Sequence, residues 1–165
     1  MVNKVRVYGK AQNRTALGIV NAYMLIHPEA TLSDLQQAFP DSLNPDSGVK
    51  KNFVVEGDRG TPAAWDGFFS KEDELITTGD GTRVALVKMW TKPSFERLVA
   101  HASQYGIEIA QFDAADGGGK KGSFRLEYLN GFVPPVIQQP KSFVWLWILG
   151  LVVVICTILC YFLGN

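Results

Sequence analysis

Residues 13–40 read NRTALGIVNAYMLIHPEATLSDLQQAFP, and this stretch decides the predicted fold. Asn13 or Thr15 can cap a helix that runs to Ile26. Apolar side chains occupy most of its circumference, which is typical of a central, buried helix. His27 precedes a proline and therefore ends the helix, because the residue before proline is disfavoured in helical geometry.

The second half of this stretch predicts a short helix that follows directly. Thr31 and Asp34 have the spacing of a capping box, with aspartate in place of glutamate. The helix then runs through Phe39 and stops at the next proline. Residues 41–48 are rich in turn formers and predict an irregular helical turn, and residues 49–55 predict an extended segment.

The rest of the chain to residue 132 is expected to form several strands and one helix. Two extended runs flank a glycine-rich turn and predict a hairpin. The acidic run at 72–74 is expected in a solvated loop or at a helix start. The expected elements are a strand near residues 2–7, the hairpin Leu75–Trp90 around Gly79–Gly81, a helix from Pro93 to about Tyr105, strands at 107–109 and 124–128, and a loop at 113–122.

This order of elements resembles a winged helix-turn-helix domain. The likeness rests on residues 16–26 and 31–39 as its first two helices and on Leu75–Trp90 as its wing. It implies a third, recognition helix within residues 41–53 that would enter the major groove of DNA. The predicted fold class is therefore α+β: a small winged-helix-like domain followed by one C-terminal transmembrane α-helix.

Two phrases of the sequence also resemble a small module of bacterial restriction and defence proteins. They are ATLSDLQQAFP at residues 30–40 and FERLVAHASQYGIEI at residues 95–109. The resemblance implies a role in antiviral defence, in which an intracellular domain perceives a partner or ligand.

The charge balance argues against a protein that binds nucleic acid by bulk charge. Sixteen basic residues equal sixteen acidic ones, so the formal net charge is zero. The few candidates for DNA contact are Lys50, Lys51, Asn52 and Arg83, and several carboxylates lie close to them in sequence. A membrane-tethered DNA-binding transcriptional regulator is therefore the alternative function, and nucleic acid the less favoured partner.

The C-terminal segment 142–164 predicts one membrane-spanning helix. It holds 19 apolar residues among 23 and no charged one, enough to cross a hydrocarbon core of roughly 30 Å. No secretory leader opens the chain, and the basic residues precede the segment. We expect a tail-anchored, single-pass protein of the inner (cytoplasmic) membrane: a cytoplasmic domain at 1–132, a proline-containing spacer at 133–141 and the helix at 142–164.

Small residues recur along this predicted membrane helix and predict self-association. Close approach of backbones drives helix association in lipid, and small side chains permit it. Both cysteines of the chain lie in this segment, so no disulfide is expected in the domain before it. The predicted association face, which makes a homo-oligomer in membrane lipid, comprises Gly150, Val153, Thr157, Cys160 and Gly164.

No motif in the sequence predicts catalysis, a metal or a cofactor. The glycine-rich run 117–123 lacks the earlier glycine of a phosphate-binding loop, since Ala114 stands there. No Gly-x-Ser-x-Gly nucleophile elbow is present. The predicted function is therefore non-enzymatic: a domain that senses a small-molecule ligand or a cytoplasmic protein partner and acts as an oligomeric membrane effector.

Overall fold

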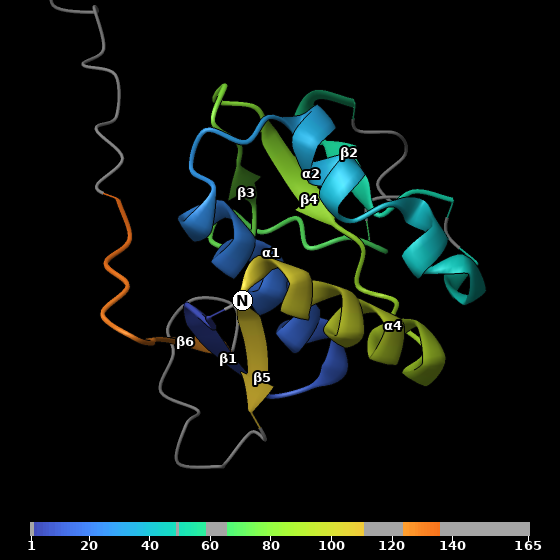
Figure 1. Cartoon of the computed structure of the whole chain (residues 1–165). Coiled ribbons are helices and arrows are strands. Elements are labelled where there is room, and N and C mark those ends of the chain that lie inside the picture. Colours follow the sequence, from blue (N-terminus) through green and yellow to red (C-terminus); the bar gives the residue numbers. More distant parts are fainter. Residues whose placement is uncertain (1, 49, 59–65, 111–123, 136–165) are drawn as a thin grey trace, which may run out of the picture. The chain divides into compact units, whose positions relative to one another are not determined.

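A computed structural model describes residues 2–48, 50–58, 66–110 and 124–135 of the chain (Figure 1). These residues belong to one compact unit, Met1–Pro135. Their main elements are three α-helices and two three-stranded β-sheets.

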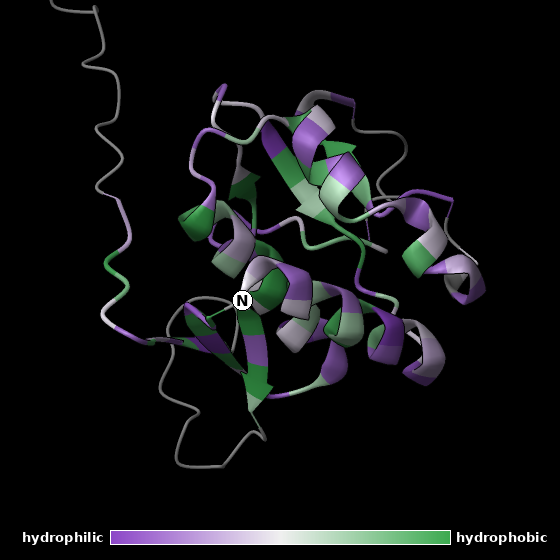
Figure 2. Ribbon diagram, in the orientation of Figure 1, coloured by the Kyte–Doolittle hydropathy of each residue, from purple (hydrophilic) through white to green (hydrophobic). Residues whose placement is uncertain are grey.

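The first sheet has the strand order β5–β1–β6, with β1 (Val5–Gly9) in the middle. β5 (Ile107–Ala110) runs parallel to β1, and β6 (Phe124–Tyr128) runs antiparallel to it. Side chains alternate along these strands because successive residues point to opposite faces. Figure 2 shows this in β5, where two isoleucines flank Glu108.

Helix α1 (Gln12–Ile26) covers the apolar face of this sheet and forms the centre of the core. Gly18 lies where α1 crosses the sheet, and a Cβ there would overlap Val7 and crowd the ring of Phe124. Glycine therefore lets the helix approach the strands closely. On the opposite face, Arg6 pairs with Glu108 and Glu127 across all three strands.

The second sheet has the order β2–β4–β3 and is antiparallel throughout. β4 (Arg83–Leu86) lies between β2 (Phe53–Val55) and β3 (Ile76–Thr77). Val84, Ala85 and Leu86 are all at most 1% exposed. Both faces of the central strand are therefore covered.

Two further helices complete the α-helical part. The capping box opens α2 (Leu32–Ala38): Thr31 and Asp34 bond each other's backbone N–H groups. Thr91 caps α4 (Lys92–Ala102) by accepting from the Ser94 N–H at 3.3 Å. Four 3₁₀ helices join these elements: η1 (Asp41–Leu43), η2 (Pro45–Ser47), η3 (Glu56–Asp58) and η4 (Ser103–Tyr105).

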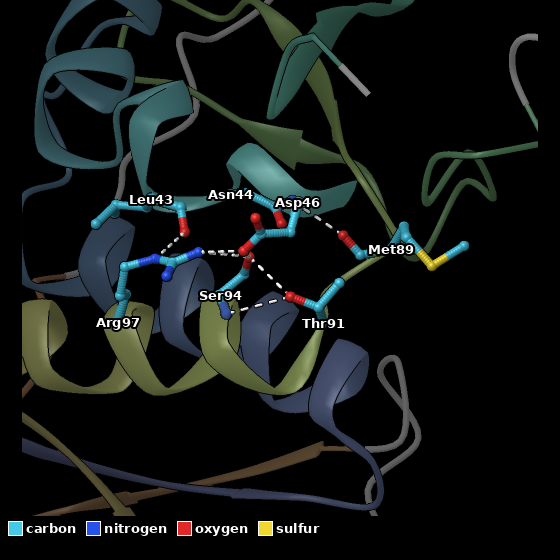
Figure 3. A network of polar contacts seen from close by, with 7 residues as sticks. All are labelled: Leu43, Asn44, Asp46, Met89, Thr91, Ser94 and Arg97. Carbon is cyan, nitrogen blue, oxygen red and sulfur yellow. Dashed lines mark hydrogen bonds and ion pairs between the residues drawn. The ribbon is translucent and has the colours of Figure 1, made fainter. Parts of the chain in front are cut away.

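A polar network attaches η1 and η2 to the start of α4 (Figure 3). The Arg97 guanidinium binds the Asp46 carboxylate at 2.7 Å and the Leu43 carbonyl at 3.3 Å. The Asn44 side-chain amide donates to the Met89 carbonyl at 2.9 Å. These bonds hold the irregular segment against the helix.

Several local predictions are confirmed. The first helix ends at Ile26, the capping box forms, and the hairpin turns through residues 79–81. Two others are wrong. The first helix begins at Gln12, with Ala11 as its N-cap. Glu74, expected in a solvated loop or at a helix start, is 5% exposed and pairs with Arg14.

The predicted fold class is also wrong. Residues 41–47, expected to contribute to a recognition helix, form η1 and η2. The predicted wing hairpin is present, but it carries a third strand, β2, and belongs to one of two sheets. The parallel pair β1–β5 was not predicted. It joins segments about a hundred residues apart, and no local pattern encodes that pairing. The chain forms a mixed α/β unit.

The prediction of a tail-anchored, single-pass protein of the inner membrane is corrected as well. A spanning helix needs about 20 consecutive apolar residues, and α1, the longest described helix, has 15. None of the helices within residues 2–135 that the structure describes is long and apolar enough to cross a membrane. Segment 142–164 and its association face lie outside the described residues.

Candidate functional site

A recess opens where α1 ends and α2 begins. The His27 N–H donates to the Tyr23 carbonyl at 2.8 Å, which is the last bond of α1, and the Ala30 N–H donates to the His27 carbonyl at 3.0 Å. The chain therefore turns tightly around Pro28 before Thr31 caps α2. The recess has a volume of about 500 Å³ and is lined by Tyr23, Ile26, His27, Pro28, Glu29, Ala30 and Asp34.

An aromatic cluster lies beside this recess and includes both histidines of the chain. Tyr23 is its central ring. The ring centroid of Tyr23 lies 4.7 Å from that of His27, 5.0 Å from Tyr105 and 5.2 Å from Phe39. The contacts with Tyr105 and Phe39 are edge-to-face, which favours aromatic pairs electrostatically. The cluster comprises Tyr23, His27, Phe39, His101 and Tyr105.

The polar atoms of this cluster differ in whether they have hydrogen-bond partners. The Ala38 carbonyl accepts from His101 Nε2 at 2.7 Å and from the Tyr105 hydroxyl at 3.4 Å. Tyr23 is 7% exposed, and its hydroxyl has no hydrogen-bond partner within the described part of the chain. The hydroxyl oxygen itself stays open to solvent. Because Tyr23 lines the recess, a group bound there can replace the solvent at this hydroxyl.

The two ring side chains in the recess have shifted pKa values. Burial raises the pKa of Tyr23 above its ordinary value of 10.0, with the charges of Tyr105 and Asp34 adding to the effect. His27 is exposed, but partial desolvation lowers its pKa below 6.5, and Lys4 adds to that shift. At neutral pH Tyr23 therefore keeps its proton, and His27 is mostly neutral.

The recess carries negative charge. Asp34 Oδ2 accepts from the Thr31 N–H at 2.9 Å and from the Thr31 hydroxyl at 2.7 Å. These two bonds hold the pKa of Asp34 below its usual value, while the charge of Asp80 acts in the opposite sense. Glu29 forms no ion pair with any described residue. The lining includes two carboxylates and no lysine or arginine.

The hairpin turn between β3 and β4 supports the rim of the recess. The Gly79 N–H donates to the Ala30 carbonyl at 2.7 Å. A Cβ at position 79 would overlap the backbone of Glu29. The turn thus fixes the position of the segment that joins α1 to α2, and only glycine allows so close an approach.

A second recess, of about 530 Å³, lies at the start of α1 and is lined by Ala11, Gln12, Asn13, Lys88, Met89 and Trp90. Two of its polar side chains already have partners. Lys88 Nζ donates to the Asp66 carbonyl, and Trp90 Nε1 donates to the Val87 carbonyl, each at 3.0 Å. The ammonium group and the indole N–H of this recess are therefore already bonded within the protein.

The four residues predicted to contact nucleic acid lie in different settings. Lys50 and Lys51 are exposed. Asn52 is 2% exposed, and its side-chain amide donates to the Phe39 and Pro40 carbonyls at 3.4 Å and 3.0 Å. Arg83 pairs with Glu56 at 3.4 Å and with Glu72 at 2.7 Å. Only the two lysines thus present unshared side chains to a partner.

Comparisons with known proteins identify no relatives for this chain. No family model matches it, and neither a search of curated proteins nor one of solved structures gives a match. The described ranges contain no group of three or more His, Cys, Asp or Glu side chains placed to hold a metal ion.

The sequence predicted the end of α1 and the start of α2, which border the recess, but it did not predict the recess itself. It located the helix end at His27 and the capping box at Thr31 and Asp34. It treated Tyr23 as one more buried residue of an apolar helix. What distinguishes Tyr23 is a ring packed against Phe39 and Tyr105 at the edge of a recess, and no local pattern encodes these contacts.

Proposed function

We propose that the protein is a non-enzymatic binding module that recognises a ligand or a partner's side chain in the recess between α1 and α2. The observation that carries this proposal is the recess of about 500 Å³, in whose wall the largely buried Tyr23 keeps a hydroxyl that bonds no described residue and stays open to solvent. A ligand that forms a hydrogen bond with this hydroxyl gains roughly 0.5–1.5 kcal/mol.

The composition of the lining suits the recognition of a ligand. The Tyr23 phenol keeps its proton because burial raises its pKa. The recess therefore offers aromatic surface, one hydroxyl and two carboxylates, which suit recognition of a polar ligand.

A ligand screen on the full chain tests this proposal. We would titrate the protein with a small-molecule set containing equal numbers of cationic, neutral and anionic compounds, and follow binding by saturation-transfer NMR. At least one class should bind, and Tyr23→Phe should weaken it about threefold to tenfold, because one hydrogen bond is lost.

The matched control is Tyr128→Phe, in β6, whose parent residue is 47% exposed. Binding to this variant should equal binding to the unchanged protein. The proposal is refuted if no compound binds, or if every compound that binds is indifferent to Tyr23→Phe.

A further inference from the structure

Negatively charged side chains outnumber positively charged ones around the recess. Glu29 and Asp34 line it, and Asp80 lies close enough to raise the pKa of Asp34 by its charge. On the positive side, Lys4 lowers the pKa of His27. The lining itself has two carboxylates and no lysine or arginine side chain.

The histidine of the recess does not offset this negative charge. Its lowered pKa leaves the imidazole mostly neutral at pH 7. Its ring lies 4.7 Å from that of Tyr23, centroid to centroid, so the two rings form a continuous aromatic wall. Aromatic faces attract cations through their quadrupole. The aromatic wall and the carboxylates therefore both favour a positively charged ligand.

The unpartnered hydroxyl of Tyr23 agrees with this charge preference. A phenol oxygen has lone pairs that accept hydrogen bonds. An ammonium or guanidinium group has only N–H donors to offer. A phosphate or carboxylate could also bond the hydroxyl, but it would be repelled by Glu29 and Asp34. A cationic donor can bond the Tyr23 oxygen and also neutralise the carboxylates, which a neutral donor does not do.

We infer that the ligand of this recess carries a positively charged nitrogen, an ammonium or guanidinium group, which Glu29 and Asp34 neutralise while the Tyr23 hydroxyl accepts one of its hydrogen bonds. This inference rests on the proposed function of the recess and adds the chemical class of its ligand. The same cationic group occurs in a free polyamine and in a lysine side chain of a partner protein. The recess can serve either source.

Calorimetric and NMR titrations of the full chain test the inference with four probes. Spermidine represents a free polyamine, and N-acetyl-lysine-methylamide represents a lysine side chain. N-acetyl-norleucine-methylamide has a similar shape without the charge, and glutarate is the anion. The His27 ring signals report binding at the recess. Both cationic probes should shift them, and the two other probes should not.

Glu29→Gln is the diagnostic variant, because Glu29 is exposed and its side chain forms no hydrogen bond or ion pair within the described residues. Asp34→Asn is unsuitable alone, since it also removes the capping box of α2. Glu29→Gln should weaken binding of the cationic probes about threefold to tenfold, the range for a charge-assisted bond near the surface. Glu96→Gln, an exposed glutamate on α4, is the matched control and should change nothing.

The outcomes separate this inference from the proposed function. A tighter complex with spermidine supports a free polyamine, and a tighter one with the lysine derivative supports a partner's side chain. If the norleucine derivative or glutarate binds the recess as tightly as its cationic counterparts, the recess is a binding site but the inference is wrong. The inference is also wrong if neither Glu29→Gln nor Tyr23→Phe weakens the binding of the cationic probes. If no probe shifts His27, the inference falls, and the broader compound screen decides whether the proposed function falls with it.

Discussion

At the scale of single residues, a buried ion pair joins α1 to the loop before β3. Arg14 pairs with Glu74, which is 5% exposed, and the Arg14 guanidinium lies 4.6 Å from the centre of the Phe69 ring. A charge so deeply buried is stable only while its partner remains. The sequence could not indicate this, because Glu74 belongs to an acidic run that has the composition of a solvated loop.

Arg14→Met should therefore destabilise the protein by about 3–5 kcal/mol, because it leaves the Glu74 carboxylate buried without a cation. Urea unfolding of the full chain measures the change. Arg97→Met is the control, since Arg97 and Asp46 form an exposed pair that should contribute at most about 1 kcal/mol. Equal losses in the two variants would show that burial of Glu74 has no energetic consequence.

His27 supplies a pH-dependent prediction at the same scale. Partial desolvation and Lys4 lower its pKa below 6.5 in the folded state. Because the unfolded chain then binds more protons near that pH, the contribution of His27 to stability is complete above pH 6.5 and declines as the pH falls below it. An NMR titration should give a pKa below 6.5, and Lys4→Met should raise it. A value above 6.5 would mean that the ring is neither desolvated nor near a cation.

At the scale of elements, local sequence patterns predicted the helices better than the sheets. The proline after His27 and the capping box at Thr31 act over a few residues, so the sequence alone locates them. The pairing of β1 with β5 joins Val5 to Ile107 and depends on the packing of everything between them. The recess could not be predicted from local patterns either, because Tyr23 becomes buried only when α2 and η4 pack against it.

The contact between the β3–β4 turn and the rim of the recess gives an element-scale prediction. Gly79→Ala should destabilise the protein by about 1–3 kcal/mol, since its Cβ would push into the backbone of Glu29. It should also weaken ligand binding, because the segment that lines the recess must move. Thermal unfolding and the NMR titration measure the two effects.

Gly57→Ala provides the comparison for this variant. Within the part of the chain that the structure describes, no atom lies within 4 Å of where its Cβ would be placed. Stability should therefore change by less than about 0.5 kcal/mol, as for most surface substitutions. If Gly79→Ala is equally harmless, the turn does not fix the rim of the recess.

At the scale of the whole molecule, balanced charge distinguishes this protein from nucleic-acid-binding domains. Sixteen acidic residues offset sixteen basic ones, and two of the four predicted DNA contacts are occupied by internal bonds. Fluorescence anisotropy should show duplex DNA binding no tighter than the roughly 10⁻⁴–10⁻⁶ M of non-specific association at physiological salt. Nanomolar, sequence-dependent binding lost in Lys50→Ala and Lys51→Ala would favour a DNA-binding regulator.

The central claim is that the recess between α1 and α2 holds a cationic group. A crystal structure of the full chain grown with N-acetyl-lysine-methylamide tests it most directly. The ammonium nitrogen should lie about 3 Å from the Tyr23 hydroxyl oxygen and within about 4 Å of a carboxylate oxygen of Glu29 or Asp34. A ligand bound elsewhere on the protein, or one whose ammonium group points out of the recess into solvent, would contradict the claim.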